Sequence, residues 1–259
     1  MPLLAFRNGG TVALKKLVRR LVPEALYRPL LRRLRAPPRV RWGSLRSTRP
    51  VSRIFGLDRG SPLDRYYIER FLLENAPHIR GRVLEIAENT YTRRFGAEQV
   101  TQSDVLHAVS GNPAATIVAD LTADNSLPAE AFDCIILTQT LPFIYDVRAA
   151  LRNLERALKP GGVLLATVPG ISQISRYDMD RWGDYWRFTS ASARRLFEEF
   201  WPTAHLAVGV HGNVLVATAY LQGLAREDLQ EHELHYVDED YPVLITVCAR
   251  KAASREPGT

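Results

Sequence analysis

The chain has 259 residues, of which 46% are hydrophobic and 24% charged, the composition of a globular protein large enough to bury one sizeable core. It contains no run of about 18 apolar residues, which argues against a transmembrane helix. Both cysteines, Cys134 and Cys248, lie in apolar runs, which argues against a disulfide framework or a cysteine-based metal site. These features predict a cytoplasmic protein with one domain and an extension.

The net charge of +6 is concentrated at the N-terminus, because residues 1–54 carry 14 Arg or Lys side chains and a single acidic one. Within residues 11–35, apolar residues recur at helical spacing and basic residues fill the other face. This pattern predicts two short basic amphipathic helices. Pro37 and Pro38 end them and begin an extended linker to about Arg53.

The basic extension has two interpretations of equal weight. It anchors the chain on an anionic surface, either the inner face of the membrane or an acidic partner, or it forms a helical hairpin that packs on its own core with solvated arginines. Nucleic-acid binding is disfavoured, since the basic stretch offers few aromatic side chains, Trp42 among them, for stacking on a base.

Residues 55–250 predict one α/β domain. After a helix over residues 64–72, short apolar runs alternate with helical patterns, which predicts a doubly wound parallel sheet with helices on both faces. The expected strands are residues 82–86, 100–103, 116–119, 132–137, 162–168, 206–210 and 243–249, the last at the sheet edge. The expected helices include residues 147–158 and 191–200. Residues 251–259 are expected to form a disordered tail.

The second half of this pattern resembles a known family. The segments FDCIILTQTL (residues 132–141) and LKPGGVLLATVP (residues 158–169) are similar, in the correct order, to class I S-adenosylmethionine-dependent methyltransferases. The resemblance implies the seven-stranded Rossmann-like sheet of that family, with S-adenosylmethionine as the cofactor. In such a sheet the ligand lies outside the carboxyl ends of the strands, where the strand order reverses.

The resemblance also implies roles for individual residues. Asp104, expected just after the second strand, would accept hydrogen bonds from the ribose hydroxyls, and Asp120 from the adenine amino group. Gln139 would line the floor beneath the reactive methyl. The implied cofactor contacts are Glu85, Ala87, Asn89, Tyr91, Thr92, Asp104, Val105, Asp120, Leu121 and Gln139. An aspartate at a strand end is often a turn former or a helix cap instead, and Asp146 is interpreted as such a cap.

The loop after the first strand departs from the family. A glycine-rich turn normally lets the backbone approach the cofactor, whereas here no glycine follows the strand until Gly96. Either the loop binds the cofactor through a different backbone path, with Asn89 in a left-handed conformation and Tyr91 over the methionine moiety, or the pocket has lost its ligand. We favour retained binding, because polar and aromatic residues are concentrated in this loop.

Two further segments, FGLDRGSPLDRYYIERFL (residues 55–72) and RYDMDRWGDYWRFTSASARRLFEE (residues 176–199), resemble a bacterial subgroup of these enzymes associated with glycosyltransferases and polysaccharide assembly. By association, this implies a carbohydrate hydroxyl as acceptor and a glycosyltransferase as partner. Flat aromatic faces suit a sugar ring, so the expected substrate contacts are Tyr177, Trp182 and Tyr185. The alternative is a structural lid, with Asp184 or Thr189 capping the next helix.

Methyl transfer to a hydroxyl needs an aligned acceptor and a base that removes its proton. The candidate catalytic bases are Asp178, Asp184 and His211. The histidine has a suitable pKa range, although a lone histidine at a strand end is more often structural. A divalent metal held by Asp178 and Asp180 is an option that the spacing does not decide.

The sequence therefore predicts an S-adenosylmethionine-dependent O-methyltransferase that acts on a sugar or glycan hydroxyl, cytoplasmic and in contact with the inner face of the membrane if residues 11–35 anchor it. Two alternatives stay open. One is a non-catalytic module of the same fold that partners a glycosyltransferase complex. The other is a methyltransferase for a lipid or a small metabolite.

Overall fold

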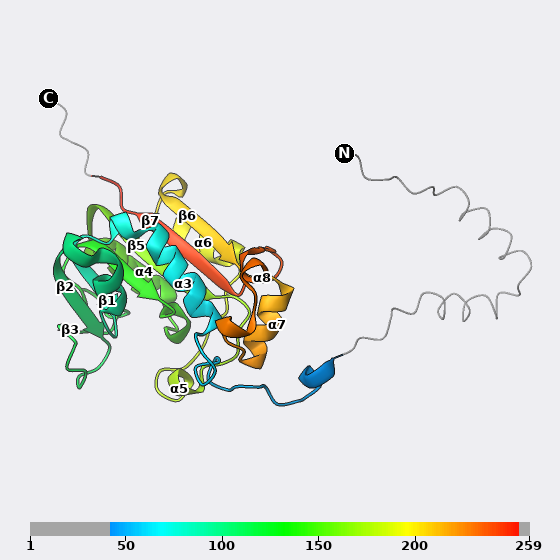
Figure 1. Cartoon of the computed structure of the whole chain (residues 1–259). Helices are drawn as coiled ribbons and strands as arrows, with labels where there is room; N and C mark the ends of the chain where they lie inside the picture. The colour runs from blue at the N-terminus through cyan, green and yellow to red at the C-terminus, as the bar shows by residue number, and fades with distance from the viewer. Residues whose placement is uncertain (1–41, 254–259) are drawn as a thin grey trace, which may run out of the picture. The chain divides into compact units, whose positions relative to one another are not determined.

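The computed structural model describes residues 42–253 (Figure 1). The chain divides into two compact units, Met1–Ser47 and Thr48–Thr259. The described part of the first unit contains the short 3-10 turn η1 (Gly43–Leu45). The helices expected within residues 11–35 lie outside the described residues, as does most of the tail expected over residues 251–259.

The second unit is built on one seven-stranded sheet with the order β3-β2-β1-β4-β5-β7-β6. The first five strands in the chain pair in parallel, and β7 pairs antiparallel with both β5 and β6. The strands are β1 (Gly81–Ile86), β2 (Val100–His107), β3 (Ile117–Val118), β4 (Phe132–Thr138), β5 (Leu158–Pro169), β6 (Leu206–His211) and β7 (Leu244–Arg250). The predicted doubly wound, Rossmann-like seven-stranded sheet is confirmed.

One detail of the predicted topology is wrong. The last strand, expected at the sheet edge, lies between β5 and β6, which leaves β6 at the edge. The physical reason is its composition: residues 244–247 are all buried, and such a continuous apolar run is covered on both faces and hydrogen-bonded on both sides.

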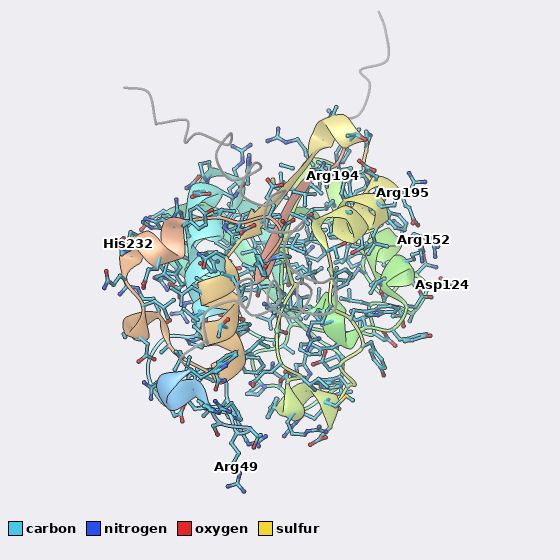
Figure 2. The ribbon with its side chains drawn as sticks, turned by 90° about the vertical axis from the view of Figure 1, so that its right-hand side faces the viewer. Arg49, Asp124, Arg152, Arg194, Arg195 and His232 are labelled. Carbon is cyan, nitrogen blue, oxygen red and sulfur yellow. The ribbon has the colours of Figure 1, made fainter. Side chains whose placement is uncertain are left out.

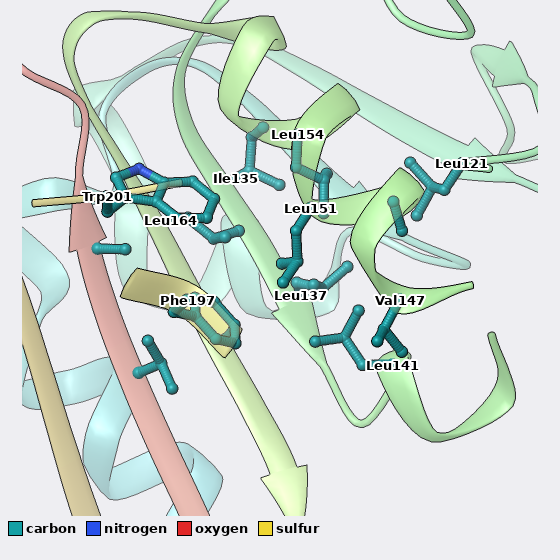
Figure 3. Packing of buried hydrophobic residues seen from close by; sticks show 14 of the residues in the cluster. Leu121, Ile135, Leu137, Leu141, Val147, Leu151, Leu154, Leu164, Phe197 and Trp201 are labelled. Carbon is teal, nitrogen blue, oxygen red and sulfur yellow. The ribbon is translucent and has the colours of Figure 1, made fainter. Parts of the chain in front are cut away.

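Helices cover both faces of the sheet (Figure 1). The α-helices of the second unit are α3 (Leu63–Glu74), α4 (Val147–Ala157), α5 (Arg176–Met179), α6 (Ser190–Glu198), α7 (Val214–Gln222) and α8 (Glu231–His235). On one face, Leu151 of α4 and Phe197 of α6 belong to a buried cluster with Leu164 of β5 (Figure 3). On the other face, Tyr67 of α3 and Val216 of α7 pack in a second cluster. The four helices α3, α4, α6 and α7 thus bury apolar residues against the sheet.

The helix starts and outer faces follow the sequence. Asp146 caps α4 by accepting a backbone hydrogen bond at 3.0 Å, as predicted, and Thr189 caps α6 through a capping box. Arg152 on α4 and Arg194 and Arg195 on α6 lie on the outside of the molecule (Figure 2). Within residues 42–253, no helix has the length and apolar character needed to cross a membrane.

Candidate functional site

The parallel strands β1 to β5 end at one edge of the sheet, which we call the carboxyl edge. The strand order reverses there, because β2 and β3 lie on one side of β1 and β4 lies on the other. This switch point is where a doubly wound sheet binds its ligand. The N-terminus of α3 also reaches the carboxyl edge: Gln139 Nε2, just after β4, donates a 3.2 Å hydrogen bond to Asp64 Oδ2.

The loop after β1 keeps a glycine-like backbone without a glycine. Ala87 has a φ of 68°, in the left-handed region, and its carbonyl accepts a 2.7 Å hydrogen bond from Asn112 Nδ2. The expectation that Asn89 takes this conformation is wrong. Asn89 has a negative φ, and its side chain instead donates to Ser103 Oγ at 3.1 Å. The turn comes directly after the strand, one residue beyond Ile86, because that is where the chain must leave the sheet.

Glu85 holds this loop in place. Its buried carboxylate accepts hydrogen bonds from the backbone N–H groups of Tyr91, at 3.2 Å, and Thr92, at 2.7 Å. Burial raises the pKa of the Glu85 carboxyl, and these hydrogen bonds oppose the rise. Thr92 is buried behind the loop, whereas the half-buried Tyr91 ring contacts Phe95, and burial raises the pKa of its phenol to about 12. Glu85 and Thr92 therefore support the loop rather than line it.

The expectation for Asp104 is also wrong in its placement. Asp104 lies within β2, not after it, and its buried carboxylate accepts from Arg82 Nε at 2.7 Å and Thr116 Oγ1 at 2.9 Å. The neighbouring Val105 is buried in the same strand. The end of β2 is His107, so a half-buried imidazole stands where the family resemblance implies a ribose-binding acid.

Asp120 fits its expected place after β3. It is exposed, and its Oδ1 accepts two hydrogen bonds from Thr122, one from the backbone N–H and one from Oγ1, both at 2.8 Å. Within the described part of the chain this leaves Oδ2 available to a ligand. Leu121 is buried, and its carbonyl accepts from Asn153 Nδ2 at 2.8 Å.

Gln139 lies at the centre of the carboxyl edge. It has a φ of 48°, and its backbone N–H donates to the Thr167 carbonyl at 3.0 Å, which fixes the turn after β4. Its side-chain Nε2 donates to Asp64, but its buried Oε1 has no hydrogen-bond partner among the described residues. An unpaired buried acceptor costs about 1–3 kcal/mol, so this oxygen is suited to a donor on a bound ligand.

Asp64 is a site residue that the sequence reasoning did not identify. It lies half-buried in the first turn of α3. Burial raises the pKa of its carboxyl, while hydrogen bonds from Tyr220, the Arg65 N–H and Gln139 oppose that rise. A signal was present: Asp64 shares the buried helical stripe of Tyr67, Ile68 and Phe71, at spacings of three, four and seven residues. Because burial of a carboxylate is costly, an aspartate on an apolar helix face indicates a buried partner or a functional role.

Aromatic side chains follow β5 at the same edge. The half-buried Trp182 lies edge-on to His107, with ring centroids 6.0 Å apart. Residues 175–187, which contain α5 and which we call the α5 segment, therefore reach the end of β2. Tyr185 lies 5.4 Å from Tyr145, whose ring stacks with Trp186 at 5.8 Å. We call Tyr145, Tyr185 and Trp186 the aromatic cluster. Its rings are 71%, 49% and 37% exposed.

The remaining expected acceptor residues are held by local contacts. The Tyr177 ring is exposed and covered on one face by the Arg181 guanidinium at 3.5 Å. Asp178 accepts a 2.5 Å hydrogen bond from Ser175 Oγ. Asp180 pairs with Arg176 at 3.1 Å. In the described part of the chain, no group of His, Cys, Asp or Glu side chains is arranged to hold a metal ion.

Two of the three candidate bases are poorly placed for that role. The buried Asp184 side chain accepts two hydrogen bonds from Arg187, at 2.6 and 2.9 Å, and one from the Ser175 N–H. Burial raises the pKa of its carboxyl, but these contacts outweigh burial and lower it. His211 lies between the Tyr67 ring and Thr246 Oγ1, and burial lowers its pKa. Both contacts are structural.

The residues present fit the cofactor that the resemblance implies. Ala87 keeps the open backbone path, Asp120 offers a free carboxylate oxygen, and Gln139 offers an unpaired buried acceptor. S-adenosylmethionine carries matching donors in its amino groups. The residues that would hold it are Ala87, Asn89, Tyr91, Asp120, Leu121 and Gln139.

Comparisons with known proteins agree with this geometry. A family model described as a methyltransferase domain matches residues 80–166, which run from β1 into β5. No sequence among the curated proteins matches the chain.

Among the solved structures that resemble it are the following three. The [4+2]-cyclase SpnF is 17% identical, with a TM-score of 0.50 over 76% of this chain and 85% of that one. A SAM-dependent methyltransferase from Archaeoglobus fulgidus is 13% identical, with a TM-score of 0.49 over 72% and 94%. The N-methyltransferase NodS from Bradyrhizobium japonicum, in complex with S-adenosyl-l-homocysteine, is 16% identical, with a TM-score of 0.45 over 78% and 94%. At these identities structural likeness bears on the fold alone, and the family match over residues 80–166 supports an S-adenosylmethionine-dependent methyltransferase domain.

Proposed function

We propose that the protein transfers a methyl group from S-adenosylmethionine to a hydroxyl of a sugar or glycan. The observation that supports this acceptor is the aromatic cluster beside the α5 segment. Three exposed rings from two separate loops contact one another there, and backbone carbonyls fix two of them. Trp186 Nε1 donates to the Ile144 carbonyl, and the Tyr185 hydroxyl donates to the Trp182 carbonyl, both at 3.1 Å. Rigid, exposed aromatic faces suit the apolar face of a sugar ring.

The chain's residues have distinct tasks in this proposal. The cofactor, when bound, supplies a methyl group on a positively charged sulfur. The loop after β1, supported by Glu85, holds one end of it, and Asp120 holds the adenine. Gln139 Oε1 accepts a hydrogen bond from the ligand at the centre of the edge. Trp182, over His107, excludes water from the side of β2. A base must still take the acceptor's proton.

Isothermal titration calorimetry with S-adenosylhomocysteine tests the cofactor part of the proposal. We expect binding in the micromolar range. The full chain is then incubated with S-adenosylmethionine and a panel of methyl glycosides and oligosaccharides, and methyl ethers are detected by mass spectrometry. Cofactor binding with methylation of an amine instead of a saccharide would reject the acceptor class. No binding at millimolar ligand would reject the enzyme.

A second candidate function is a non-catalytic partner of a glycosyltransferase complex. Two observations favour it: Ala87 replaces a glycine at a left-handed position, and His107 replaces an acid at the end of β2. The same calorimetric titration separates the two functions. A chain that binds neither S-adenosylmethionine nor its product, yet co-purifies with a glycosyltransferase, is the partner and not the enzyme.

Membrane contact through residues 11–35, and with it a lipid or small-metabolite acceptor, is a separate proposal. Its support is the basic, amphipathic sequence of that stretch. Flotation with vesicles containing anionic lipid tests it on the full chain. We expect wild type to float and a variant with Lys15→Gln, Lys16→Gln and Arg19→Gln to stay in the dense fraction. Equal flotation of the two chains would reject the anchor.

A further inference from the structure

We propose that Asp64 is the base that takes the proton from the acceptor hydroxyl. This inference rests on the proposed function and names a catalytic residue for it. Asp64 lies outside the segment that matches the methyltransferase family, residues 80–166, because α3 precedes β1. The role is therefore one that α3 adds to the shared sheet.

The position of Asp64 carries the proposal. Its Oδ2 accepts from Gln139 Nε2 at 3.2 Å, which places the carboxylate beside the residue after β4 at the switch point of the sheet. The other amide atom of Gln139, the buried Oε1, lacks a partner among the described residues. The Asp64 carboxylate and the unpaired Gln139 Oε1 therefore lie next to each other, at the place where we expect a ligand to bind.

The donors around Asp64 are uncharged. Oδ1 accepts from the Arg65 backbone N–H at 2.9 Å, Oδ2 accepts from Gln139, and the buried Tyr220 hydroxyl is the third partner. Uncharged donors orient a carboxylate without holding it as tightly ionised as a cation does. Asp64 is a half-buried residue, and it lies at the carboxyl edge where an acceptor would enter.

Most other carboxylates near the carboxyl edge are held by protein contacts, and Asp120, whose Oδ2 is free, is assigned to the adenine. Asp184 is bound by Arg187, Asp104 by Arg82, and Glu85 by the loop amides. Asp178, the remaining predicted base, has a bond to Ser175 within α5's first turn. Asp64 differs from them because it combines burial, uncharged partners and a place next to Gln139.

The electrostatics around Asp64 agree with a base. Burial raises the pKa of the Asp64 carboxyl, which strengthens the carboxylate as a proton acceptor. Burial also raises the pKa of Tyr220 well above its usual value, so this phenol stays protonated and donates. The charged and titratable groups around the pair are Arg65 beside Asp64, Tyr91 across from α3, and Arg187 beyond Tyr220.

The step balances without a further reactant. The acceptor O–H bond breaks and its proton passes to an Asp64 oxygen. The oxygen's electron pair forms the new O–CH3 bond, and the S–CH3 bond breaks with its electrons left on the sulfur. The products are a methyl ether, S-adenosylhomocysteine and a protonated Asp64, which returns its proton to water.

The first test compares Asp64→Asn with the wild-type full chain by calorimetry. A base near the reacting methyl lies close to the positive sulfur, so removing its charge should weaken S-adenosylmethionine binding roughly tenfold. S-adenosylhomocysteine has an uncharged sulfur, so its affinity for the variant should stay within about threefold of its affinity for wild type. Glu74→Gln, at the exposed far end of the same helix, should leave both affinities unchanged.

The second test is the rate of methylation of the saccharide found in the panel, measured against pH. The wild-type rate should fall as pH drops through the raised Asp64 pKa. Asp64→Asn should lose about 100-fold or more and lose that pH dependence, while Asp64→Glu recovers part of the rate. Should Asp64→Asn change neither the ratio of the two affinities nor the rate, Asp64 is not the base. Wild type that binds neither ligand would instead reject the proposed function.

Discussion

The carboxyl edge differs between the ends of β1 and β2 and the end of β4. At the ends of β1 and β2, the side chains expected to touch a ligand are committed to the protein: Glu85 to loop amides and Asp104 to Arg82. Ligand contact in this half falls to the backbone, as at Ala87. At the end of β4, side chains take over, since Gln139 and Asp64 have bonding capacity to spare. We therefore expect the ends of β1 and β2 to position the cofactor through the backbone, and the end of β4 to supply the side chains that take part in the reaction.

The largest expected effect comes from the support. Glu85→Ala removes the acceptor of two loop N–H groups in a buried site. We expect the free energy of unfolding to fall by about 3 kcal/mol and S-adenosylhomocysteine binding to be lost with the loop. Urea denaturation and calorimetry measure the two. Glu88→Ala, at an exposed loop position, is the matched control and should cost under about 0.5 kcal/mol. If both variants behave alike, Glu85 does not hold the loop.

The next effect concerns the α5 segment. Asp184→Asn breaks the pair with Arg187 and should lower the free energy of unfolding by about 2 kcal/mol. Because the folded pKa of Asp184 is depressed, its contribution is fully present above the usual aspartate pKa and is lost as pH falls through the folded pKa. Thermal unfolding from pH 7 to pH 3 should therefore show a gap between wild type and variant that narrows in acid. A gap that stays constant would mean that the pair does not set the pKa.

The sheet was predictable and the details of its edge were not. Alternating apolar runs determine strands and helices, so the order of elements follows from local patterns. The Pro-Gly-Gly run, expected before the fifth strand, lies within β5. Asp104 was misplaced because β2 continues to His107. A polar residue inside a strand is tolerated there only through Arg82, a partner on another strand 22 residues away in sequence, and single-strand patterning does not show such a pair.

Asp64 also depends on a contact that local sequence patterns do not show. Its helix was predicted, but its meeting with Gln139 joins residues 75 apart in the sequence. That contact depends on how α3 lies across the sheet, which tertiary packing decides. Gln139 and Asp120 were placed correctly, because each directly follows a strand whose end the apolar run already marks.

A smaller effect of opposite sign tests whether Ala87 stores strain. A left-handed conformation costs an alanine about 1–2 kcal/mol, partly offset by glycine's greater entropy in the unfolded chain. Ala87→Gly should therefore raise the free energy of unfolding by about 0.5–1 kcal/mol, and cofactor affinity should hold or improve. The control Ala149→Gly, inside α4, should lower stability by about 1 kcal/mol. Destabilisation by both would show that Ala87 is relaxed in the folded chain.

The smallest effect on stability should come from the aromatic cluster, and it separates folding from acceptor binding most cleanly. Tyr145 is 71% exposed, so Tyr145→Ala should change the free energy of unfolding by under about 0.5 kcal/mol and leave S-adenosylhomocysteine affinity unchanged. The KM for the methylated saccharide should rise roughly tenfold, because a stacking face worth about 1 kcal/mol or more is removed. Tyr236→Ala, equally exposed but after α8, should leave that KM unchanged. An unaltered KM in Tyr145→Ala would move the acceptor away from the cluster, toward Tyr177 and the outer side of α5. That outcome would leave the chemistry at Asp64 and Gln139 intact, since within residues 42–253 neither side chain is hydrogen-bonded to the aromatic cluster.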